Sequence, residues 1–384
     1  MSGGNTMAIK TFDQMAAAGE FPLIGFNAAG LGNNPYVDAI ATARLDTHYV
    51  TVAPRGHQPD YIKAYAGGLD GKPFAVRLPF AGERIAILDG AGGFTLRQSY
   101  VEEIRRAIRH IHSWGGFSLL DMHNYCRWYV RANGPVSGRV VQAWNGGFAL
   151  WTAIGAPDCP VNYPLLARIW AAIARELRDE PGVFGYGLMN EPHNLGSVPD
   201  GGVNVETLWS NNVQQLITAV REVDPRHFIT VAGNAFASAL DWPRRSDVLK
   251  NLQDPGGRLL YEAHQYPDKN GQGGGKWNQA ADSITYRDRV ADWYPYIDWL
   301  KANGKRGIAG EFGGPDHVPG MRTYFTELHK YFDANHILRF QWLAGPGDDD
   351  DNPNGMDRND GTLKPNTRSL MARIGNTTTA YGPR

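Results

Sequence analysis

Eight short apolar runs recur along the chain, and the stretches between them are long enough for a helix in most cases. Most of the runs are continuous and do not alternate with polar positions, which is typical of strands buried on both faces of a parallel sheet. The sequence therefore predicts eight strands, over residues 21–27, 74–80, 117–125, 184–193, 228–234, 259–267, 307–313 and 338–345.

Amphipathic patterns with helical spacing lie between these runs. Several of them end at Gly or at Asp-Pro, residues that commonly stop a helix. The predicted helices cover residues 99–116, 163–182, 205–225, 286–305 and 321–336, with a C-terminal helix in 364–375.

Eight strands joined by helices over this length predict an α/β protein, a single (β/α)8 TIM barrel. A doubly wound open sheet is the alternative, but no GxGxxG or P-loop motif follows any strand. We expect one catalytic domain over residues 11–384, preceded by an expression leader or a disordered N-terminus at 1–10. The region between the first two strands (31–74) is elaborated, and its residues 47–54 predict an extra strand or hairpin. A long loop is expected after the third strand (124–164).

Composition removes several classes of function. The 384 residues carry 38 Lys and Arg against 39 Asp and Glu, so their charge favours neither nucleic acid nor an anionic membrane. No apolar run approaches the ~20 residues that a membrane-spanning helix needs. We therefore expect a monomer with no nucleic-acid or membrane partner. The 11 Trp residues suggest flat aromatic surface that does more than pack the core.

Polar and aromatic side chains concentrate at the carboxyl ends of the predicted strands, where barrels of this type carry their active sites. An ordinary core would not place its few charged and imidazole groups at corresponding positions of so many strands. The candidate site residues are Arg77, His123, Asn190, Glu191, His264, Tyr266, Glu311 and Trp342, with Asn124 and Asn234 at further strand ends.

Glu191 and Glu311 end the fourth and seventh predicted strands, which face each other across the mouth of such a barrel. Burial of an unpaired carboxylate costs several kcal/mol, so each glutamate needs partners or a chemical role. One glutamate alone is more often a partnered, structural carboxylate. Two together, about 5–5.5 Å apart, are the arrangement of retaining glycoside hydrolysis. One of them protonates the leaving oxygen and the other attacks the anomeric carbon.

The neighbouring residues suit the same chemistry. Asn190 is placed to hold the sugar 2-hydroxyl, a contact that strengthens in the transition state. Tyr266 and Arg77 suit the nucleophilic carboxylate, whose ionised form a donor or a cation favours. Trp342 offers an apolar face on which a pyranose ring can stack. Taken singly, each residue also has a structural interpretation, because a lone histidine or strand tryptophan usually serves packing.

In order along the chain, these residues resemble those of glycoside hydrolase family 5, the cellulase family of clan A barrels. GLMNEPH resembles the family signature around the acid/base, and IAGEFG resembles its nucleophile strand. VRLPF, LLDMHNY, YEAHQY and FQWLAG resemble the strands that carry its arginine, its histidines and tyrosine, and its tryptophan. The resemblance runs from about Phe21 to the final helix, and the eight family positions correspond to the eight candidate site residues.

The resemblance implies a retaining mechanism without metal or other cofactor, with Glu191 as acid/base and Glu311 as nucleophile. The remaining six candidates would bind substrate. The implied activity is that of a secreted or periplasmic endo-β-1,4-glucanase acting on a β-linked polysaccharide or oligosaccharide. Alternatives in the same family are endo-β-mannanase and hydrolases of other β-glucans and β-glycosides. A non-catalytic carbohydrate-binding barrel is the alternative from another class, and the presence of both glutamates argues against it.

Apart from Trp342, the tryptophans divide into two groups by their surroundings. Five lie in loop-like stretches and are candidate sugar platforms, although loop packing explains each equally well: Trp128, Trp144, Trp151, Trp242 and Trp277. Five others fall in helical patterns and are expected in the core: Trp114, Trp170, Trp209, Trp293 and Trp299.

The two cysteines and an acidic run raise separate questions. Cys126 and Cys159 lie at the two ends of the long loop, where a disulfide would stabilise the loop by roughly 3–4 kcal/mol. Two free buried thiols are the alternative. The run Asp348 to Asp351 suggests calcium, but the EF-hand pattern fails because Gly361 occupies its twelfth position. A solvated acidic loop is the better interpretation.

Overall fold

The structure is a computed structural model. It describes residues 9–31, 52–67, 69, 71–132, 141–144, 147–195, 200–268, 271, 286–315, 317–318, 320–345 and 350–383. Of residues 131–132, 141–144, 147–149 and 286–287 only the backbone is described.

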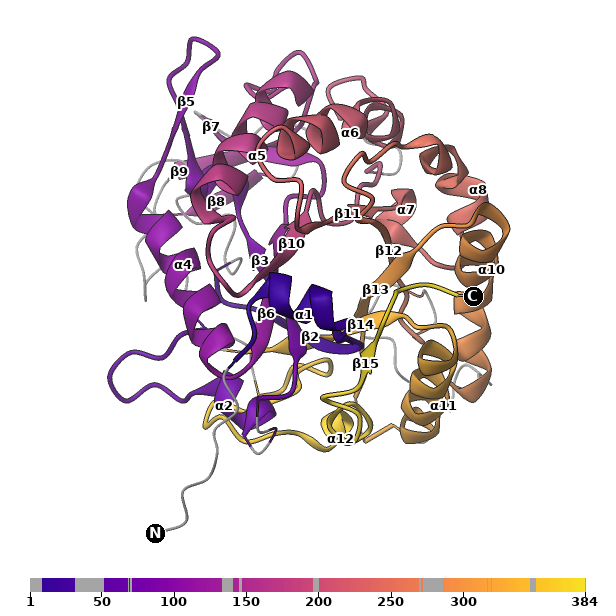
Figure 1. Cartoon of the computed structure of the whole chain (residues 1–384). Coiled ribbons are helices and arrows are strands. Elements are labelled where there is room, and N and C mark those ends of the chain that lie inside the picture. Colours follow the sequence, from indigo (N-terminus) through magenta and orange to yellow (C-terminus); the bar gives the residue numbers. More distant parts are fainter. Residues whose placement is uncertain are drawn as a thin grey trace.

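Eight parallel strands close into a barrel, and helices surround it (Figure 1). Each strand pairs with the next one along the chain, and the last pairs with the first. This closure confirms the predicted (β/α)8 barrel and rules out the alternative, an open doubly wound sheet. The barrel strands are β2 (Ile24–Ala28), β3 (Phe74–Phe80), β6 (Gly116–Met122), β10 (Val183–Gly187), β11 (Phe228–Ala232), β12 (Leu259–His264), β13 (Gly307–Phe312) and β14 (Leu338–Ala344).

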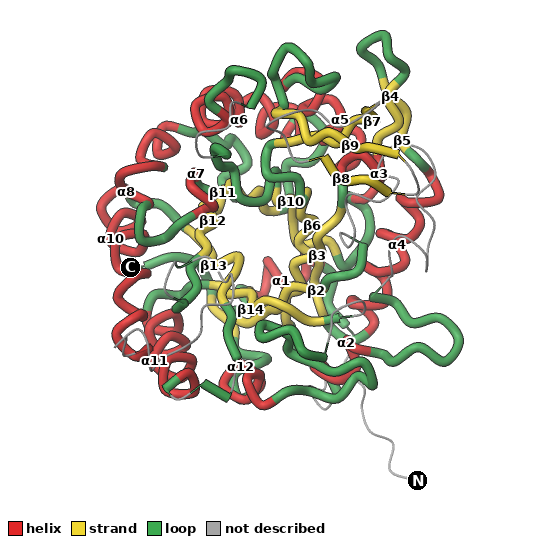
Figure 2. The backbone as a smooth tube through the Cα atoms, turned by 180° about the vertical axis from the view of Figure 1, so that it is seen from behind, coloured by secondary structure: helices red, strands yellow, loops and turns green. Residues whose placement is uncertain are grey.

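The helices form a ring outside the strands (Figure 2). Asn162 caps the start of α5 (Tyr163–Leu177) and Asn204 caps the start of α6 (Val205–Arg221), because each side chain accepts a backbone N–H bond from the first turn. The helices longer than one turn are α1 (Phe12–Ala18), α2 (Tyr61–Ala66), α4 (Gln98–Ser113), α5 (Tyr163–Leu177), α6 (Val205–Arg221), α10 (Tyr294–Asn303) and α11 (Met321–Ala334). Shorter ones are α3 (Gly82–Ile85), α7 (Asn234–Ala237), α8 (Trp242–Arg245) and α12 (Arg368–Met371).

Two predicted helices differ from those observed. The expected helix 286–305 is a 3₁₀ segment, η2 (Tyr286–Trp293), followed by α10. Pro295 explains the break, because proline lacks the N–H that a continuing helix would use and fits best in a first turn. The expected C-terminal helix is only η3 (Pro365–Thr367) and α12.

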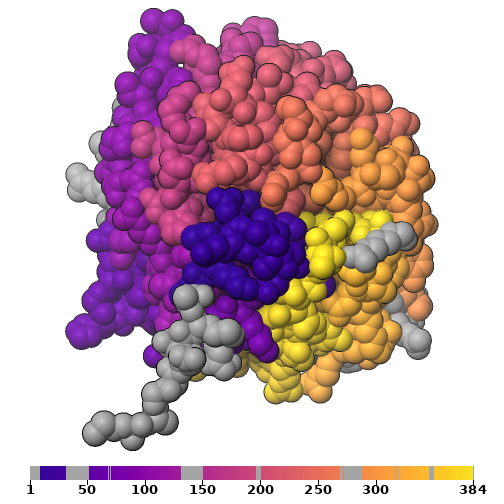
Figure 3. Space-filling model, viewed as in Figure 1, coloured from indigo at the N-terminus to yellow at the C-terminus, as the bar shows by residue number. Residues whose placement is uncertain are grey.

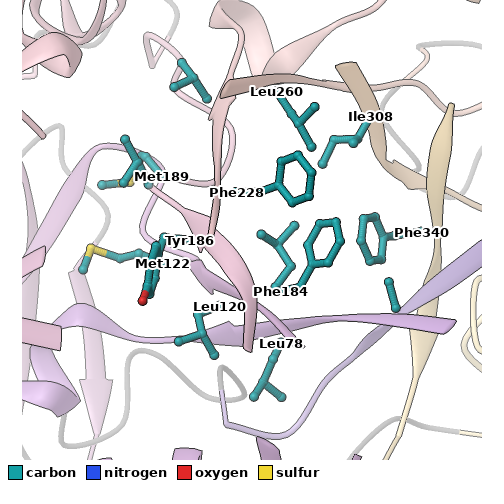
Figure 4. Packing of buried hydrophobic residues seen from close by; sticks show 14 of the residues in the cluster. Leu78, Leu120, Met122, Phe184, Tyr186, Met189, Phe228, Leu260, Ile308 and Phe340 are labelled. Atoms are coloured by element: carbon teal, nitrogen blue, oxygen red, sulfur yellow. The ribbon is translucent and has the colours of Figure 1, made fainter. Parts of the chain in front are cut away.

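Aromatic and aliphatic side chains fill the middle of the molecule (Figure 4). The rings of Phe184 and Phe228, from adjacent strands, stack with centroids 4.9 Å apart. Helix α1 lies across the amino-terminal ends of the strands, where Phe12 packs against both rings. Figure 3 shows these indigo residues covering the centre of that face. The opposite end, where the strands finish, is therefore the one available for a site.

Among the described residues, three small sheets lie outside the barrel. The predicted first strand divides into β1 (Phe21–Pro22), which pairs with β15 (Thr377–Thr378), and the barrel strand β2. A hairpin of β4 (Ala86–Leu88) and β5 (Phe94–Leu96) follows the second barrel strand.

The segment expected as a long loop, 124–164, contains an antiparallel sheet of β7 (Arg127–Ala132), β8 (Val141–Trp144) and β9 (Gly147–Ala153). Most of the predicted extra strand at 47–54 lies outside the described residues, and Val52 to Pro54 are not in a strand.

Candidate active site

All eight candidate residues gather at the carboxyl ends of the barrel strands, and Arg77 lies in the centre of the group. Arg77, on β3, is fully buried. Its Nη1 donates to Glu311 Oε1 at 3.0 Å, and its Nη2 donates to Asn190 Oδ1 at 2.7 Å. One cation thus connects the ends of three strands that are far apart in sequence.

The two glutamates face each other beside an imidazole. Oxygens of Glu191 and Glu311 and a ring nitrogen of His264 lie within 4.8 Å of one another. His264 Nδ1 is 2.7 Å from Glu191 Oε1 and 3.7 Å from Glu311 Oε2. Tyr266 Oη donates to Glu311 Oε2 at 2.9 Å. The gap between the carboxylates suits retaining glycoside hydrolysis, because the inverting arrangement needs about 6.5–9.5 Å to hold a water.

The surroundings raise the pKa of both Glu191 and His264. Burial and then the Glu311 carboxylate raise the pKa of Glu191, and contact with His264 only partly offsets them. Burial alone would lower the pKa of His264, but Glu311, Glu191 and Glu262 outweigh it and raise that pKa to about 10. Glu191 is therefore suited to carry a proton, and His264 is a cation at neutral pH.

Glu262 is a site residue that the sequence interpretation missed. Its Oε1 lies 2.8 Å from Arg77 Nη2 and 3.0 Å from His264 Nε2, and its Oε2 accepts the Thr230 hydroxyl at 2.6 Å. Burial opposes ionisation, but Arg77 and His264 outweigh it and lower the pKa of Glu262. Gly310 provides the room, because a Cβ there would lie 2.4 Å from Glu262 Oε1. A charge inside the apolar run LLYEAH was the available signal.

Asp121 and Asn27 are two further residues of the site that the sequence interpretation missed. Asp121, on β6, lies 3.0 Å from Arg77 Nη2 and 2.7 Å from His123 Nδ1. Asn27 Oδ1 accepts from Arg77 Nη1 at 3.0 Å, and its amide nitrogen donates to the Gly310 carbonyl. Both side chains are fully buried and do not face the cavity, so their part is to position Arg77 and His123.

His123 and Trp342 form a stacked pair at the same end of the barrel. Their ring centroids are 5.4 Å apart with planes 13° from parallel. Asn190 Nδ2 donates to His123 Nε2 at 3.2 Å, so Nδ1 carries the proton and donates to Asp121. The Tyr125 hydroxyl also contacts His123 Nε2. Both rings are half-buried, and Trp342 offers an apolar ring face at this end of the barrel.

A cavity of about 810 Å³ opens beside Glu191. Its walls come from the segments that follow β10, β11 and β12, and they include His264, Tyr266, Phe236 and Arg244. Because the cavity reaches Glu191 and both polar and aromatic side chains line it, a sugar could approach the acid from this side.

The structure corrects two of the predicted sugar platforms. Trp128 and Trp242 are 2% and 0% exposed, so both are core residues. Trp242 begins the short helix α8 and packs against Trp299 with ring centroids 5.5 Å apart. Trp151 remains partly exposed and stacks on Tyr129 at 5.5 Å.

Trp277 and the side chain of Trp144 lie outside the described residues. The core prediction is confirmed for Trp170, Trp209, Trp293 and Trp299, whereas Trp114 is only partly buried against the core.

The predicted disulfide is wrong, because both cysteines are free thiols. Burial raises the pKa of Cys126 to about 12 and raises that of Cys159. Each thiol therefore has little tendency to form a thiolate.

One cluster among the described residues has metal-ligand geometry, and it consists of Glu191, His264 and Glu311. A cation there would compete with the proton of His264, whose pKa is raised to about 10. Of the acidic run, only Asp350 and Asp351 are described, and the Asp350 carboxylate accepts the Asn359 N–H at 2.7 Å. Within the described part of the chain, no helix has the length and apolar character that crossing a bilayer requires.

A closed (β/α)8 barrel with two facing glutamates beside a cavity is the arrangement of a barrel-type glycoside hydrolase. The chain belongs to the family described as Cellulase (glycosyl hydrolase family 5), whose family model matches residues 72–348. This membership confirms the resemblance seen in the sequence and makes the protein a glycoside hydrolase.

Several relatives of the chain are named as endoglucanases. Endo-beta-1,4-glucanase A of Emericella nidulans is 28% identical over 275 residues, covering 70% of each chain. Endoglucanase 1 of Saitozyma flava is 28% identical over 282 residues, covering 71% of this chain and 70% of that protein. The solved structure of Pseudomonas stutzeri endoglucanase Cel5A in complex with cellobiose has a TM-score of 0.72 at 25% identity, covering 95% and 98% of the two chains.

Proposed function

We propose that the protein is a retaining endo-β-1,4-glucanase in which Glu191 is the acid/base and Glu311 the nucleophile. The observation that carries the proposal is the approach of the two carboxyl groups to within 4.8 Å beside His264. The directions of the electrostatic effects agree with these roles, because burial and Glu311 raise the pKa of Glu191.

In the first step, a Glu311 oxygen attacks the anomeric carbon while Glu191 gives its proton to the glycosidic oxygen. The carbon–oxygen bond breaks, the leaving chain departs as an alcohol, and the sugar stays on Glu311 as an ester. In the second step, Glu191 removes a proton from water, and the resulting oxygen attacks the same carbon. The ester bond breaks, Glu311 returns to a carboxylate, and Glu191 is again protonated.

The surrounding residues support these steps. Arg77 and Tyr266 hydrogen-bond to the two oxygens of Glu311 and hold the carboxylate in one orientation. Asn190, fixed by Arg77, is positioned for the 2-hydroxyl, and Trp342 provides a ring face for a sugar. His264 keeps Glu191 beside the nucleophile and, as a cation, stabilises it when it has lost its proton.

The β-1,4-glucan assignment follows the relatives. Two solved neighbours at 25% identity, Pseudomonas stutzeri Cel5A and XacCel5A, are complexes with cellobiose and cellopentaose. Endo-β-mannanase and other β-glycan hydrolases use the same arrangement of carboxylates and remain the alternatives within the family. A non-catalytic binding barrel would have no reason to keep a carboxyl group whose proton affinity is raised beside a second carboxylate.

The same proposal covers location and organisation. A polymer cannot enter a cell unaided, so we place the protein outside the cytoplasm. We also propose that residues 11–384 are a single catalytic domain that acts as a monomer and without a metal or other cofactor.

The test is reducing-sugar release from carboxymethylcellulose, glucomannan and mannan, assayed in parallel with the same enzyme preparation. We expect the highest rate on carboxymethylcellulose and retention of anomeric configuration by NMR of the first products. Faster release from mannan would replace the glucanase assignment by mannanase. Inverted products would refute the roles of Glu191 and Glu311, and no release from any β-glycan would refute the enzyme itself.

A further inference from the structure

Glu191 has an unusual backbone for a residue that must hold its side chain in place. Its φ is 42°, in the left-handed region that side chains other than glycine rarely adopt. It lies four residues past the end of β10, and the N–H of the neighbouring Asn190 donates to the carbonyl of Met122, the last residue of β6, at 2.8 Å. Such a conformation persists only where the surroundings fix it.

His193 supplies a contact that fixes it. Its Nδ1 lies 2.9 Å from the carbonyl oxygen of Glu191. Its Nε2 lies 3.4 Å from Nη1 of Arg127. A carbonyl can only accept and a guanidinium can only donate, so the ring is neutral with its proton on Nδ1. Burial and Arg127 agree with this state, because they lower the pKa of His193 to about 4.

The ring itself is held from two other sides. Phe236 stacks on it with centroids 3.8 Å apart and planes 17° from parallel. Arg127 is fully buried, donates through Nη2 to the His193 carbonyl at 2.8 Å, and forms an ion pair with Asp200. Arg127 begins β7, so the small sheet outside the barrel is connected through His193 to the backbone of Glu191.

We propose that His193 is a positioning residue that fixes the backbone of Glu191 and thereby aims its carboxyl group at the leaving oxygen. This inference rests on the proposed role of Glu191 as acid/base. His193 hydrogen-bonds to the backbone of Glu191 and to neither reacting carboxylate, and it also lines the cavity, so the test below compares two leaving groups and does not rely on overall binding.

The expected consequence is specific to acid catalysis. Without the Nδ1 bond, the Glu191 backbone relaxes and its carboxyl group moves toward the cavity, away from Glu311 and His264. Poor leaving groups then lose protonation, whereas activated aryl leaving groups hardly need it. The burial and the Glu311 charge that raise the pKa of Glu191 weaken as well, so the alkaline limb of the pH profile moves to lower pH. The ionisable groups that face this carboxyl group are Glu311, His264, His123, Arg77 and Tyr266, and those near His193 are Arg127, Asp200 and Tyr125.

Two substitutions separate the hydrogen bond from the packing. His193→Phe keeps a flat ring against Phe236 and removes the donor. His193→Asn loses the stack but retains an N–H near the position of Nδ1. For His193→Phe we expect kcat on cello-oligosaccharides to fall about 10- to 100-fold and the single-turnover rate of aryl release from a dinitrophenyl cellobioside to fall less than about threefold. For His193→Asn we expect the ratio of the two rates and the alkaline limb to return toward wild type.

His112 offers a matched control at the opposite end of the barrel. Its Nδ1 also bonds a carbonyl, that of Gly116 at 3.3 Å, and its ring also packs against a phenylalanine, Phe117. His112→Phe should change neither the rate ratio nor the alkaline limb.

The outcomes distinguish this inference from the proposal on which it depends. If Glu191→Ala discriminates between the two leaving groups but His193→Phe lowers both rates equally with an unmoved alkaline limb, His193 is merely structural. Unchanged rates for His193→Phe would also overturn the inference. If Glu191→Ala itself fails to discriminate, the acid/base assignment is wrong instead. A poorly folding His193→Phe variant leaves the test to His193→Asn, whose rate ratio must then lie closer to wild type than that of Glu191→Ala.

Discussion

Buried histidine–carboxylate pairs lie at both ends of the barrel, and they behave in opposite ways. At the closed end, His227 Nδ1 lies 2.6 Å from Asp224 Oδ2, and the same oxygen accepts the Tyr186 hydroxyl at 2.6 Å. At the open end, His264 Nδ1 lies 2.7 Å from Glu191 Oε1. The contact distances are nearly equal, so proximity alone does not distinguish a site from a structural pair.

The difference lies in what else surrounds each carboxylate. Burial alone would raise the pKa of Asp224, but His227 and Tyr186 outweigh it, and that pKa is far below its usual range. Glu191 has one imidazole, faces a second carboxylate, and has a raised pKa. Phe12 of α1 covers His227, whereas a cavity of about 810 Å³ adjoins Glu191. The functional end is thus the one where hydrogen bonds do not offset the effect of burial on the carboxyl pKa and where a cavity gives access to that carboxyl group.

The largest effect should come from the nucleophile at the open end. We expect Glu311→Ala to lower kcat by about 10⁴-fold or more on every substrate, because no other group can form the covalent intermediate. Rates on cello-oligosaccharides and on an aryl cellobioside, with thermal unfolding as the folding control, check this. Substantial turnover of either substrate by a folded variant would reassign the nucleophile.

A somewhat smaller and substrate-dependent effect should follow removal of the acid. Glu191→Ala should slow poor leaving groups by about 10³-fold and the first step on activated aryl glycosides by less than about tenfold, because the latter need little protonation. Single-turnover release of the aryl group isolates that step. Equal losses on both substrates would contradict the role of Glu191.

The corresponding change at the closed end should affect stability and not turnover. Asp224→Ala leaves His227 and Tyr186 without their partner and should lower the free energy of unfolding by about 3 kcal/mol. Denaturant unfolding measures this loss, and kcat per folded molecule at 25 °C should change by less than about twofold. A large fall in kcat would mean that the closed end is coupled to the site.

The smallest effect is a difference in how the two ends respond to pH. The pKa of His264 rises from 6.5 to about 10 on folding, so its contribution to stability is full below pH 6.5 and is lost as pH rises through 10. The pKa of Asp224 falls below 3.8 on folding, so its contribution is present above pH 3.8 and is lost in stronger acid. Unfolding measured across pH should show a shallower alkaline decline for His264→Gln and a shallower acid decline for Asp224→Ala. Parallel curves for all three proteins would contradict this assignment.

The sequence was sufficient for the barrel and for the residues at its mouth. Strands buried on both faces leave continuous apolar runs, and a charge at the end of such a run, as at Glu191 or Glu311, is visible without coordinates. The eight candidates come together in the structure, and their catalytic and binding roles stay predictions.

The residues inside the strands were harder to find. Glu262 and Asp121 stand out in the sequence as charges in apolar runs, as Glu191 does. Their structural role, however, is to pair with Arg77, which lies on another strand. The register of the closed barrel determines which strands bring their side chains to the Arg77 guanidinium. The sequence pattern of a single strand carries no information on that register.

Local patterns also misled where a single residue redirects the chain. Trp242 follows a strand in a polar stretch and resembles an exposed platform. It nevertheless begins the short helix α8, with Pro243 in the first turn, and its indole packs against Trp299. Cys126 and Cys159 flank one segment, but position in a loop does not determine where thiols point. Both errors concern side-chain direction, which periodicity does not determine outside regular elements.

The pairing of β1 with β15 has a practical consequence for handling the enzyme. Tyr381 Oη donates to the Pro22 carbonyl at 2.8 Å, and its ring packs against Phe21 and Phe228 near α1. Both the beginning and the end of the described fold are thus fixed at the face opposite the cavity. A tether added ahead of α1 or behind β15 would attach the enzyme to a bead or fibre with its mouth turned outward. Immobilisation through either end should therefore leave polymer free to enter.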